Sequence, residues 1–149
     1  MPQYIATRRV QFAETDMAGI VHFANFYRWM EETEHEFFRS LGFTIMEPQD
    51  NDTYLGWPRV SASCTFERPL KYDDEFQVRL DIERIGVKSV TYAIEFWQEQ
   101  RIAYGRLKTA CCICGAHANI RSIPIPEHYL ALLHESDELP RKTGKETQG

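Results

Sequence analysis

Apolar side chains recur along this chain with two different periods, and these periods predict its secondary structure. Between Phe23 and Leu41 they recur at intervals of three, four and seven residues, as on one face of an α-helix. Glutamates lie on the other face, and Gly42 follows where a glycine commonly ends a helix. The pattern predicts one long amphipathic helix over residues 23–41.

From Pro58 to about Ala118, apolar and polar side chains alternate, which is typical of half-buried β-strands. The runs cover residues 60–66, 78–83, 90–96 and about 102–114. The breaks between them have the length of hairpin connections. With a first strand predicted within residues 3–12, the order is one strand, the helix and four further strands.

The other segments are predicted to be a loop, a short helix and a tail. Residues 43–56 are rich in turn-forming residues and predict a loop. Residues 124–134 predict a short terminal helix, and residues 135–149 carry few apolar side chains and are expected to be mobile. We therefore expect one α+β domain over residues 1–134, in which the helix packs its apolar stripe on the sheet.

Composition limits the class of protein further. The 149 residues suit a single domain, and 43% hydrophobic content is typical of a folded globule. A net charge of −5 argues against nucleic-acid binding. No apolar run approaches the roughly 20 residues of a membrane span, and no secretory segment opens the chain. These features predict a cytoplasmic protein.

Four cysteines, Cys64, Cys111, Cys112 and Cys114, raise the question of a metal site. Zinc sites typically use pairs of cysteines separated by two residues, with a second pair elsewhere in the chain. In a strand, alternation turns Cys112 and Cys114 to one face and Cys111 to the other. We predict that these side chains fill the core as small apolar groups and that the protein holds no metal.

The segment before the predicted helix carries the candidate chemistry. Asp16 precedes the helix by a few residues, and Gly19 lets the chain turn between them. Asp16 either caps a turn or serves as a nucleophile or general base towards a carbonyl held by the N–H groups of the helix N-terminus. Neighbouring His22 either hydrogen-bonds the loop or orients the carboxylate, a water or the substrate. Glu14 is expected to be exposed or to brace the loop.

The second role of Asp16 suits a thioester. A thiol with a pKa of roughly 8.5 leaves as the thiolate without a strong general acid. One carboxylate and one amide donor can therefore supply both the nucleophile and the stabilisation of the oxyanion, through a mixed anhydride or an activated water. No Gly-x-Ser-x-Gly, phosphate-binding loop or His-Glu-x-x-His motif offers another hydrolytic chemistry.

Residues 14–29 resemble the opening motif of the 4-hydroxybenzoyl-CoA thioesterase family of hot-dog-fold proteins. The motif has an Asp, a Gly three residues later, an apolar pair, and then aromatic–x–Asn–aromatic at the helix start. Residues 66–74 and 123–127 are similar to later segments of the family, so the resemblance spans roughly residues 5–130. It implies a hot-dog fold, with a five-stranded antiparallel sheet wrapped around one long helix.

The resemblance also implies an activity, that of an acyl-CoA thioesterase acting on an aromatic or short-chain acyl group. Asp16 matches the catalytic carboxylate, and the backbone N–H of Phe23 matches the donor that polarises the carbonyl. Lys88 and Arg121 match positions that contact coenzyme A phosphates, although Gly86 replaces a basic residue often found near that turn. Coenzyme A would be part of the substrate, so no separate cofactor is expected.

Two other functions suit the same architecture. A hydratase or dehydratase would use His22 as the base towards an acyl chain, and a non-catalytic protein would only bind acyl-CoA. The carboxylate of Asp16 favours hydrolysis over both. A single five-stranded sheet leaves unpaired edges, and hot-dog domains pair with acyl groups bound at the subunit boundary. We therefore expect a homodimer or a homotetramer.

Overall fold

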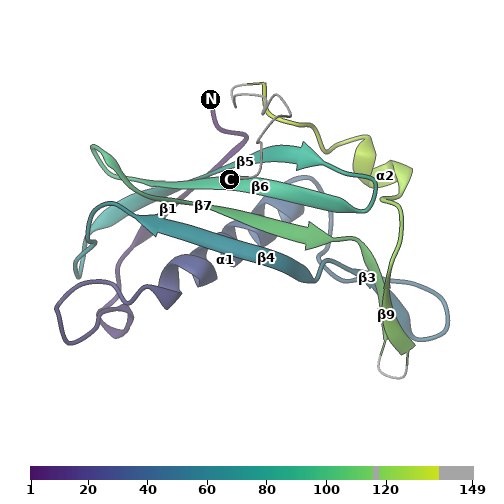
Figure 1. Cartoon of the computed structure of the whole chain (residues 1–149), viewed down its shortest axis with the longest axis horizontal. Coiled ribbons are helices and arrows are strands. Elements are labelled where there is room, and N and C mark those ends of the chain that lie inside the picture. The colour runs from purple at the N-terminus through teal and green to yellow at the C-terminus, as the bar shows by residue number, and fades with distance from the viewer. Residues whose placement is uncertain (116–117, 138–149) are drawn as a thin grey trace, which may run out of the picture.

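Five long strands form a curved antiparallel sheet in the computed structural model, which describes residues 1–115 and 118–137 (Figure 1). In spatial order they are β1 (Tyr4–Arg9), β5 (Glu75–Ile85), β6 (Ser89–Trp97), β7 (Arg101–Ala110) and β4 (Arg59–Phe66). One helix, α1 (Ala24–Ser40), lies across one face of this sheet. The predicted α+β hot-dog arrangement is confirmed.

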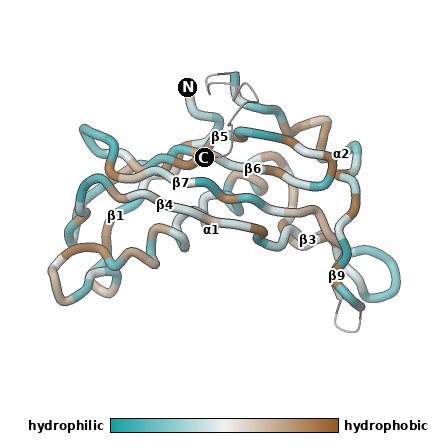
Figure 2. Tube along the Cα trace, viewed as in Figure 1, coloured by the Kyte–Doolittle hydropathy of each residue, from teal (hydrophilic) through white to brown (hydrophobic). Residues whose placement is uncertain are grey.

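The core lies between α1 and the sheet because the two periods of the sequence turn apolar faces towards each other. Every second residue of the central strands is fully buried, and Figure 2 shows hydrophobic positions recurring along them. The positions of β5 and β6 with an exposed fraction of 0% are Val78, Leu80, Ile82, Val90, Tyr92, Ile94 and Phe96. On the helix side, Phe26, Trp29 and Met30 pack against them, and all three are almost completely buried.

The end of α1 follows the sequence closely. Gly42 has a φ of +82°, and its N–H donates to the Arg39 carbonyl at 3.0 Å. The Phe43 N–H returns to the Phe38 carbonyl at 2.9 Å, so the last carbonyls of the helix have partners. The prediction that Gly42 ends the helix is confirmed.

A second sheet corrects the predicted loop at residues 43–56. Its strand order is β2 (Glu47–Pro48), β3 (Thr53–Gly56), β8 (Cys112–Gly115) and β9 (Ala118–Ser122). The turn from β2 to β3 is made by Asn51 and Asp52, both at positive φ. Turn residues in a short segment predict a loop, and β3 is a strand through its pairing with the neighbouring β2 and with the distant β8.

The fourth predicted run, about 102–114, is likewise two strands rather than one. It divides at Cys111 into β7 and β8, which belong to different sheets. The Cys111 N–H donates to the Lys88 carbonyl at 2.7 Å, and its carbonyl accepts from Ile123 at 2.8 Å. These contacts draw the chain out of the first sheet, and residue alternation alone does not reveal them.

The C-terminal helix is shorter than the predicted 124–134. It comprises α2 (Glu127–Leu130), and it buries Tyr129 against Phe38 and Trp57. The Tyr129 hydroxyl donates to the Glu47 carboxylate, which joins α2 to the second sheet. Of the predicted tail, residues 138–149 lie outside the described residues. The Ser136 N–H donates to the Ile82 carbonyl, so contacts with β5 reach at least that far.

Three of the four cysteines, Cys111, Cys112 and Cys114, are buried, which confirms their packing role, and Cys64 is half-buried. Burial raises the pKa of the Cys64 thiol to about 11 and that of Cys111 to about 12, so these thiols stay protonated at neutral pH. Within residues 1–115 and 118–137, no three His, Cys, Asp or Glu side chains are grouped to hold a metal ion. In the same residues no helix is long and apolar enough to span a membrane.

One glutamate of α1, Glu34, is buried instead of lying on the solvent-exposed face of the helix. Glu34 is 1% exposed, and its nearest charged partner is Arg59, whose Nη2 lies 3.1 Å from Oε1. Burial raises the pKa of this carboxyl to about 7, although Arg59 opposes the shift. The Tyr92 hydroxyl, also buried, has no hydrogen-bond partner among the described residues.

This burial predicts a pH-dependent stability. A carboxyl with a pKa near 4.5 when unfolded and about 7 when folded favours the folded state fully only below pH 4.5. The free energy of unfolding of the wild type should therefore fall by about 3 kcal/mol, relative to Glu34→Gln, as the pH rises from 4.5 to above 7. Urea unfolding across this range measures the difference.

The matched control is Glu99→Gln, which removes an exposed glutamate from the β6–β7 turn. Its stability should run parallel to that of the wild type. Parallel curves for Glu34→Gln and the wild type would show that folding does not raise the pKa of Glu34.

Candidate active site

A cleft of about 580 Å³ opens at the N-terminal end of α1. Its walls come from the loop that precedes α1, from the first turn of the helix and from the chain that leaves β4. Ile20, Phe26 and Phe66 give it an apolar surface, and the charges at its wall include Asp16 and Arg68. The predicted site segment therefore does border a cavity.

The loop folds back on itself and is fixed at both ends. The Asp16 N–H donates to the Ile20 carbonyl at 2.9 Å, and the Gly19 N–H donates to the Asp16 carbonyl at 3.0 Å. Gly19 has a φ of +78°, a conformation that residues with a Cβ rarely adopt. The Val21 N–H then donates to the Leu70 carbonyl at 2.8 Å, which ties the loop to the segment after β4.

Asp16 is an exposed carboxylate at the cleft wall. Its Oδ1 accepts a hydrogen bond from the Ala18 N–H at 2.8 Å, so the residue does cap a turn. Its second oxygen has no hydrogen-bond partner among the described residues. The turn therefore fixes the side chain and leaves one carboxylate oxygen available.

The N-terminus of α1 supplies a free donor beside this carboxylate. Phe23 is the N-cap residue of α1 and lines the cleft. Within the described part of the chain, its backbone N–H has no hydrogen-bond partner, whereas the Asn25 N–H donates to the His22 carbonyl. A free N–H at a helix N-terminus can stabilise a developing oxyanion.

His22 faces the helix start rather than the carboxylate. Its backbone N–H donates to the Glu14 carbonyl at 2.9 Å, and its Nδ1 accepts from the Ala24 N–H at 3.3 Å. Its ring packs against Phe23, with the ring centroids 4.8 Å apart. These contacts describe a loop-bracing role, and a catalytic role for His22 stays a prediction.

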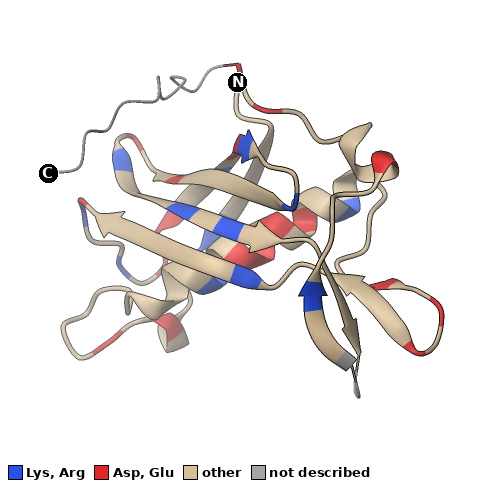
Figure 3. Ribbon diagram, turned by 45° about the vertical axis from the view of Figure 1, so that its right-hand side comes forward, with Lys and Arg blue, Asp and Glu red and all other residues tan. Residues whose placement is uncertain are grey.

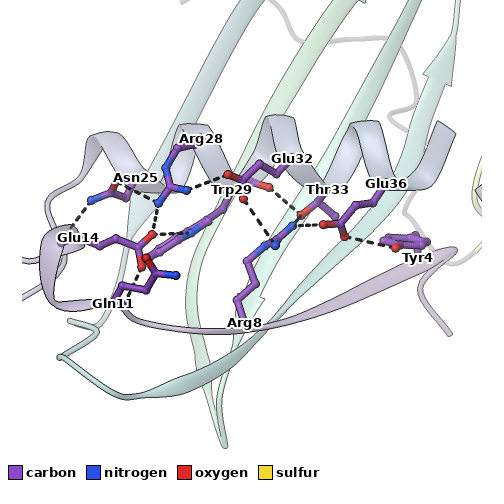
Figure 4. Close-up of polar contacts among 10 residues, drawn as sticks. All are labelled: Tyr4, Arg8, Gln11, Glu14, Asn25, Arg28, Trp29, Glu32, Thr33 and Glu36. Carbon is purple, nitrogen blue, oxygen red and sulfur yellow. Dashed lines mark hydrogen bonds and ion pairs between the residues drawn. The ribbon is translucent and has the colours of Figure 1, made fainter. Parts of the chain in front are cut away.

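The buried carboxylate of Glu14, for which the sequence allowed either exposure or a bracing role, holds the loop in place. Glu14 ends a 3₁₀ turn, η1 (Phe12–Glu14), and accepts hydrogen bonds from the Gln11 N–H at 2.7 Å and from Trp29 Nε1 at 3.1 Å (Figure 4). It also pairs with Arg28, and its backbone carbonyl accepts from Asn25 Nδ2 at 2.9 Å. The loop-bracing role is confirmed, and the alternative of an exposed Glu14 is wrong.

A second group of charges joins β1 to the middle of α1. Arg8 donates to Glu36 Oε1 at 2.8 Å and lies 3.6 Å from Glu32, and the Tyr4 hydroxyl donates to Glu36 (Figure 4). Figure 3 shows acidic residues in succession along this helix. The side of α1 that carries Glu32 and Glu36 is thus attached to β1 by ion pairs.

Lys88 and Arg121 lie at the other end of the molecule from Asp16. Lys88 follows β5 in the turn to β6, next to Val87, whose carbonyl accepts from the Ile125 N–H. Arg121 lies on β9, on the side of the molecule opposite the loop before α1 (Figure 1). Since α1 is about 26 Å long, a single chain does not bring these cations to the Asp16 cleft.

Comparison with known proteins places the chain in a family. The model of the Thioesterase superfamily matches residues 18–103. The chain is 36% identical over 132 residues to a protein of Aquifex aeolicus (strain VF5) named as an esterase, covering 89% of this chain and 98% of that protein. It is 28% identical over 133 residues to a 1,4-dihydroxy-2-naphthoyl-CoA hydrolase of Thermosynechococcus vestitus, covering 88% of each.

Among solved structures, a gentisyl-coenzyme A thioesterase superposes with a TM-score of 0.72 at 33% identity, covering 85% of this chain and 99% of that chain. The chain therefore belongs to the Thioesterase superfamily and is a thioesterase, an enzyme that hydrolyses thioester bonds. The superfamily is wider than the 4-hydroxybenzoyl-CoA thioesterases that the motif resembles, and that narrower assignment stays a prediction.

Proposed function

We propose that the protein hydrolyses aromatic acyl-CoA thioesters at the Asp16 cleft. One observation carries the proposal: an available oxygen of Asp16 and the free N–H of Phe23 border the same cavity. The carbonyl oxygen of the substrate accepts a hydrogen bond from the Phe23 N–H. Asp16 attacks the carbonyl carbon, or takes a proton from a water that does so.

The negative charge that develops on the carbonyl oxygen during this reaction would be stabilised by groups at the cleft. As the carbonyl carbon becomes tetrahedral, its oxygen gains negative charge, and the positive end of α1 stabilises that charge. Collapse of the tetrahedral species breaks the carbon–sulfur bond and releases coenzyme A as a thiolate. With Asp16 as nucleophile, the resulting anhydride is hydrolysed by water to the free acid and the original carboxylate.

Aromatic side chains favour an aromatic acyl group over a short aliphatic one. The rings of Phe26 and Phe66 meet edge to face with centroids 5.0 Å apart at the cleft wall, and Phe23 lies at its rim. Such rings attract another ring in offset or edge-to-face geometry. Two relatives described above are named for hydroxylated aromatic acyl groups, which supports the same choice.

Replacing Asp16 by Asn should lower kcat by about 100-fold or more while acyl-CoA still binds, because the amide can neither attack nor accept a proton. Release of free thiol from a panel of aromatic and short-chain acyl-CoA thioesters measures the rate. Asp52→Asn, a change in the β2–β3 turn, is the matched control. If Asp16→Asn kept half of the wild-type kcat on its best substrate, Asp16 would be a structural residue.

We also propose that Lys88 and Arg121 contact phosphates of coenzyme A, as the family resemblance implies. Both are exposed cations on a chain with a net charge of −5, and cations of this kind can bind phosphate on an otherwise acidic protein. Because they lie far from Asp16 in the same chain, they would serve the cleft of a neighbouring subunit.

Lys88→Gln and Arg121→Gln should each raise KM for acyl-CoA several-fold, because each removes a phosphate contact. The KM for the matching acyl-N-acetylcysteamine thioester, which lacks the phosphates, should stay unchanged. Steady-state kinetics on both substrates decide the point. Equal effects on the two substrates would assign these side chains another role.

The protein is further proposed to work as a homodimer or homotetramer with its sites at subunit boundaries. Strand β4 is an edge of the five-stranded sheet, and Val60 and Phe66 on it are exposed. The loop before α1 also exposes Met17, and Phe23 at the wall of the cleft is exposed. Exposed edges and apolar rims of this kind favour association.

Sedimentation equilibrium at micromolar protein should show a species of at least twice the 17.5 kDa chain mass. Specific activity should fall when dilution dissociates it, since each site would lose groups supplied by the neighbouring chain. A fully active 17.5 kDa species would contradict the shared site.

A further inference from the structure

Arg68 is an unpaired cation at the wall of the Asp16 cleft. It borders that cleft and two adjoining hollows of about 460 and 300 Å³ near the β6–β7 turn. Among the described residues, its guanidinium has no hydrogen bond and no ion pair. Arg101, the other arginine in these walls, instead binds Glu67 at 2.6 Å and Glu95 at 3.2 Å.

The neighbouring acid, Glu67, makes no hydrogen bond or ion pair with Arg68. Glu67 accepts the 2.6 Å hydrogen bond from Arg101, and this bond is the main cause that lowers the pKa of its carboxyl, although the charge of Arg68 is also among the causes. Asp16 is the other acid in the wall of the cleft, and it is held by its own turn. The positive charge of Arg68 is thus available to a bound molecule.

The backbone holds Arg68 at a fixed place relative to Asp16. The Arg68 N–H donates to the Ile102 carbonyl at 3.0 Å, and Pro69 restricts the conformation of the residue before it. Next comes Leu70, which is 1% exposed and whose carbonyl accepts from Val21 in the Asp16 loop. Only Pro69 therefore separates Arg68 from Leu70, whose carbonyl anchors the loop.

We propose that Arg68 binds an oxygen acceptor group of the thioester substrate, a proposal that rests on the proposed function. Guanidinium donates two parallel hydrogen bonds to carboxylate or phosphate oxygens and can also donate to a phenolic oxygen. The acidic groups of the cleft would repel an electron-rich substrate, and Arg68 offsets that repulsion. The acceptor is either a substituent of the acyl group or a phosphate of coenzyme A.

Arg68→Gln tests the contact, because it removes the charge and keeps most of the length of an exposed side chain. Four thioesters distinguish the two sources: 2,5-dihydroxybenzoyl and benzoyl groups, each on coenzyme A and on N-acetylcysteamine. If the acceptor is on the acyl group, kcat/KM should fall about tenfold or more for both dihydroxybenzoyl thioesters alone. If it is a phosphate, the fall should affect both coenzyme A thioesters alone.

Two further variants complete the design. Arg68→Lys should recover part of the lost kcat/KM because it restores the charge without the planar guanidinium. Arg39→Gln removes an exposed arginine from the far end of α1 and should behave as the wild type. No loss with any thioester, or an equal loss with all four, would overturn the proposal.

A measurement without turnover separates this proposal from the proposed hydrolysis. Calorimetry of coenzyme A and of 2,5-dihydroxybenzoate compares the wild type with Arg68→Gln. Weaker binding of either compound to the variant supports the contact even if the wild type hydrolyses none of the thioesters, which would contradict the proposed function alone. Unchanged affinities for both compounds would overturn the role of Arg68.

Discussion

The buried carboxylate of Glu14 is the contact on which the geometry of the cleft depends. It lies between η1 and α1, and it receives hydrogen bonds from a backbone N–H and the Trp29 indole and an ion pair from Arg28. A buried carboxylate is costly unless such partners surround it, so η1 and the first turns of α1 must stay together. The Asp16 loop starts and ends at these two elements, and its shape is set by their separation.

The proposed site of hydrolysis and the proposed site of coenzyme A binding lie at opposite ends of α1. Its N-terminus supplies the Phe23 N–H, and its other end lies near the second sheet, α2 and the turn that carries Lys88. A helix about 26 Å long cannot place one cleft at both ends. Pairing of two chains in opposite directions would bring the basic end of one beside the catalytic end of the other. This geometry, rather than exposed apolar area alone, would give the proposed association a functional reason.

Much of the fold could be predicted from the sequence because its strongest signals are local. The helix, its end at Gly42 and the alternation of β5 and β6 each depend on residues a few positions apart. The second sheet could not be predicted, because it depends on the pairing of β3 with β8, which lies more than 50 residues away in the chain. The division at Cys111 has the same cause. The backbone hydrogen bonds of Cys111 with Lys88 and Ile123 interrupt the strand there, although apolar and polar residues continue to alternate in the sequence.

In the candidate site, too, the features that depend on neighbouring residues could be predicted, and those that depend on contacts between distant residues could not. Asp16 and Gly19 could be found because a carboxylate and a glycine before a helix form a local motif. The bracing by Arg28 and Trp29 could not, since both also fit an ordinary amphipathic helix. Arg68 gave no sequence signal, because an arginine before a proline is ordinary in a loop.

The structure draws attention to Arg68 because, unlike several other arginines, it forms no ion pair among the described residues. Arg8, Arg28, Arg59 and Arg101 are all engaged by carboxylates. At the cleft, however, one Asp16 oxygen, the Phe23 N–H and the Arg68 guanidinium have no partner among the described residues. Polar groups that a fold holds in place without a partner are available to hydrogen-bond or pair with a bound molecule. A carboxylate, an amide donor and a cation around an apolar cavity fit a substrate that has a reactive carbonyl, an apolar body and an oxygen acceptor.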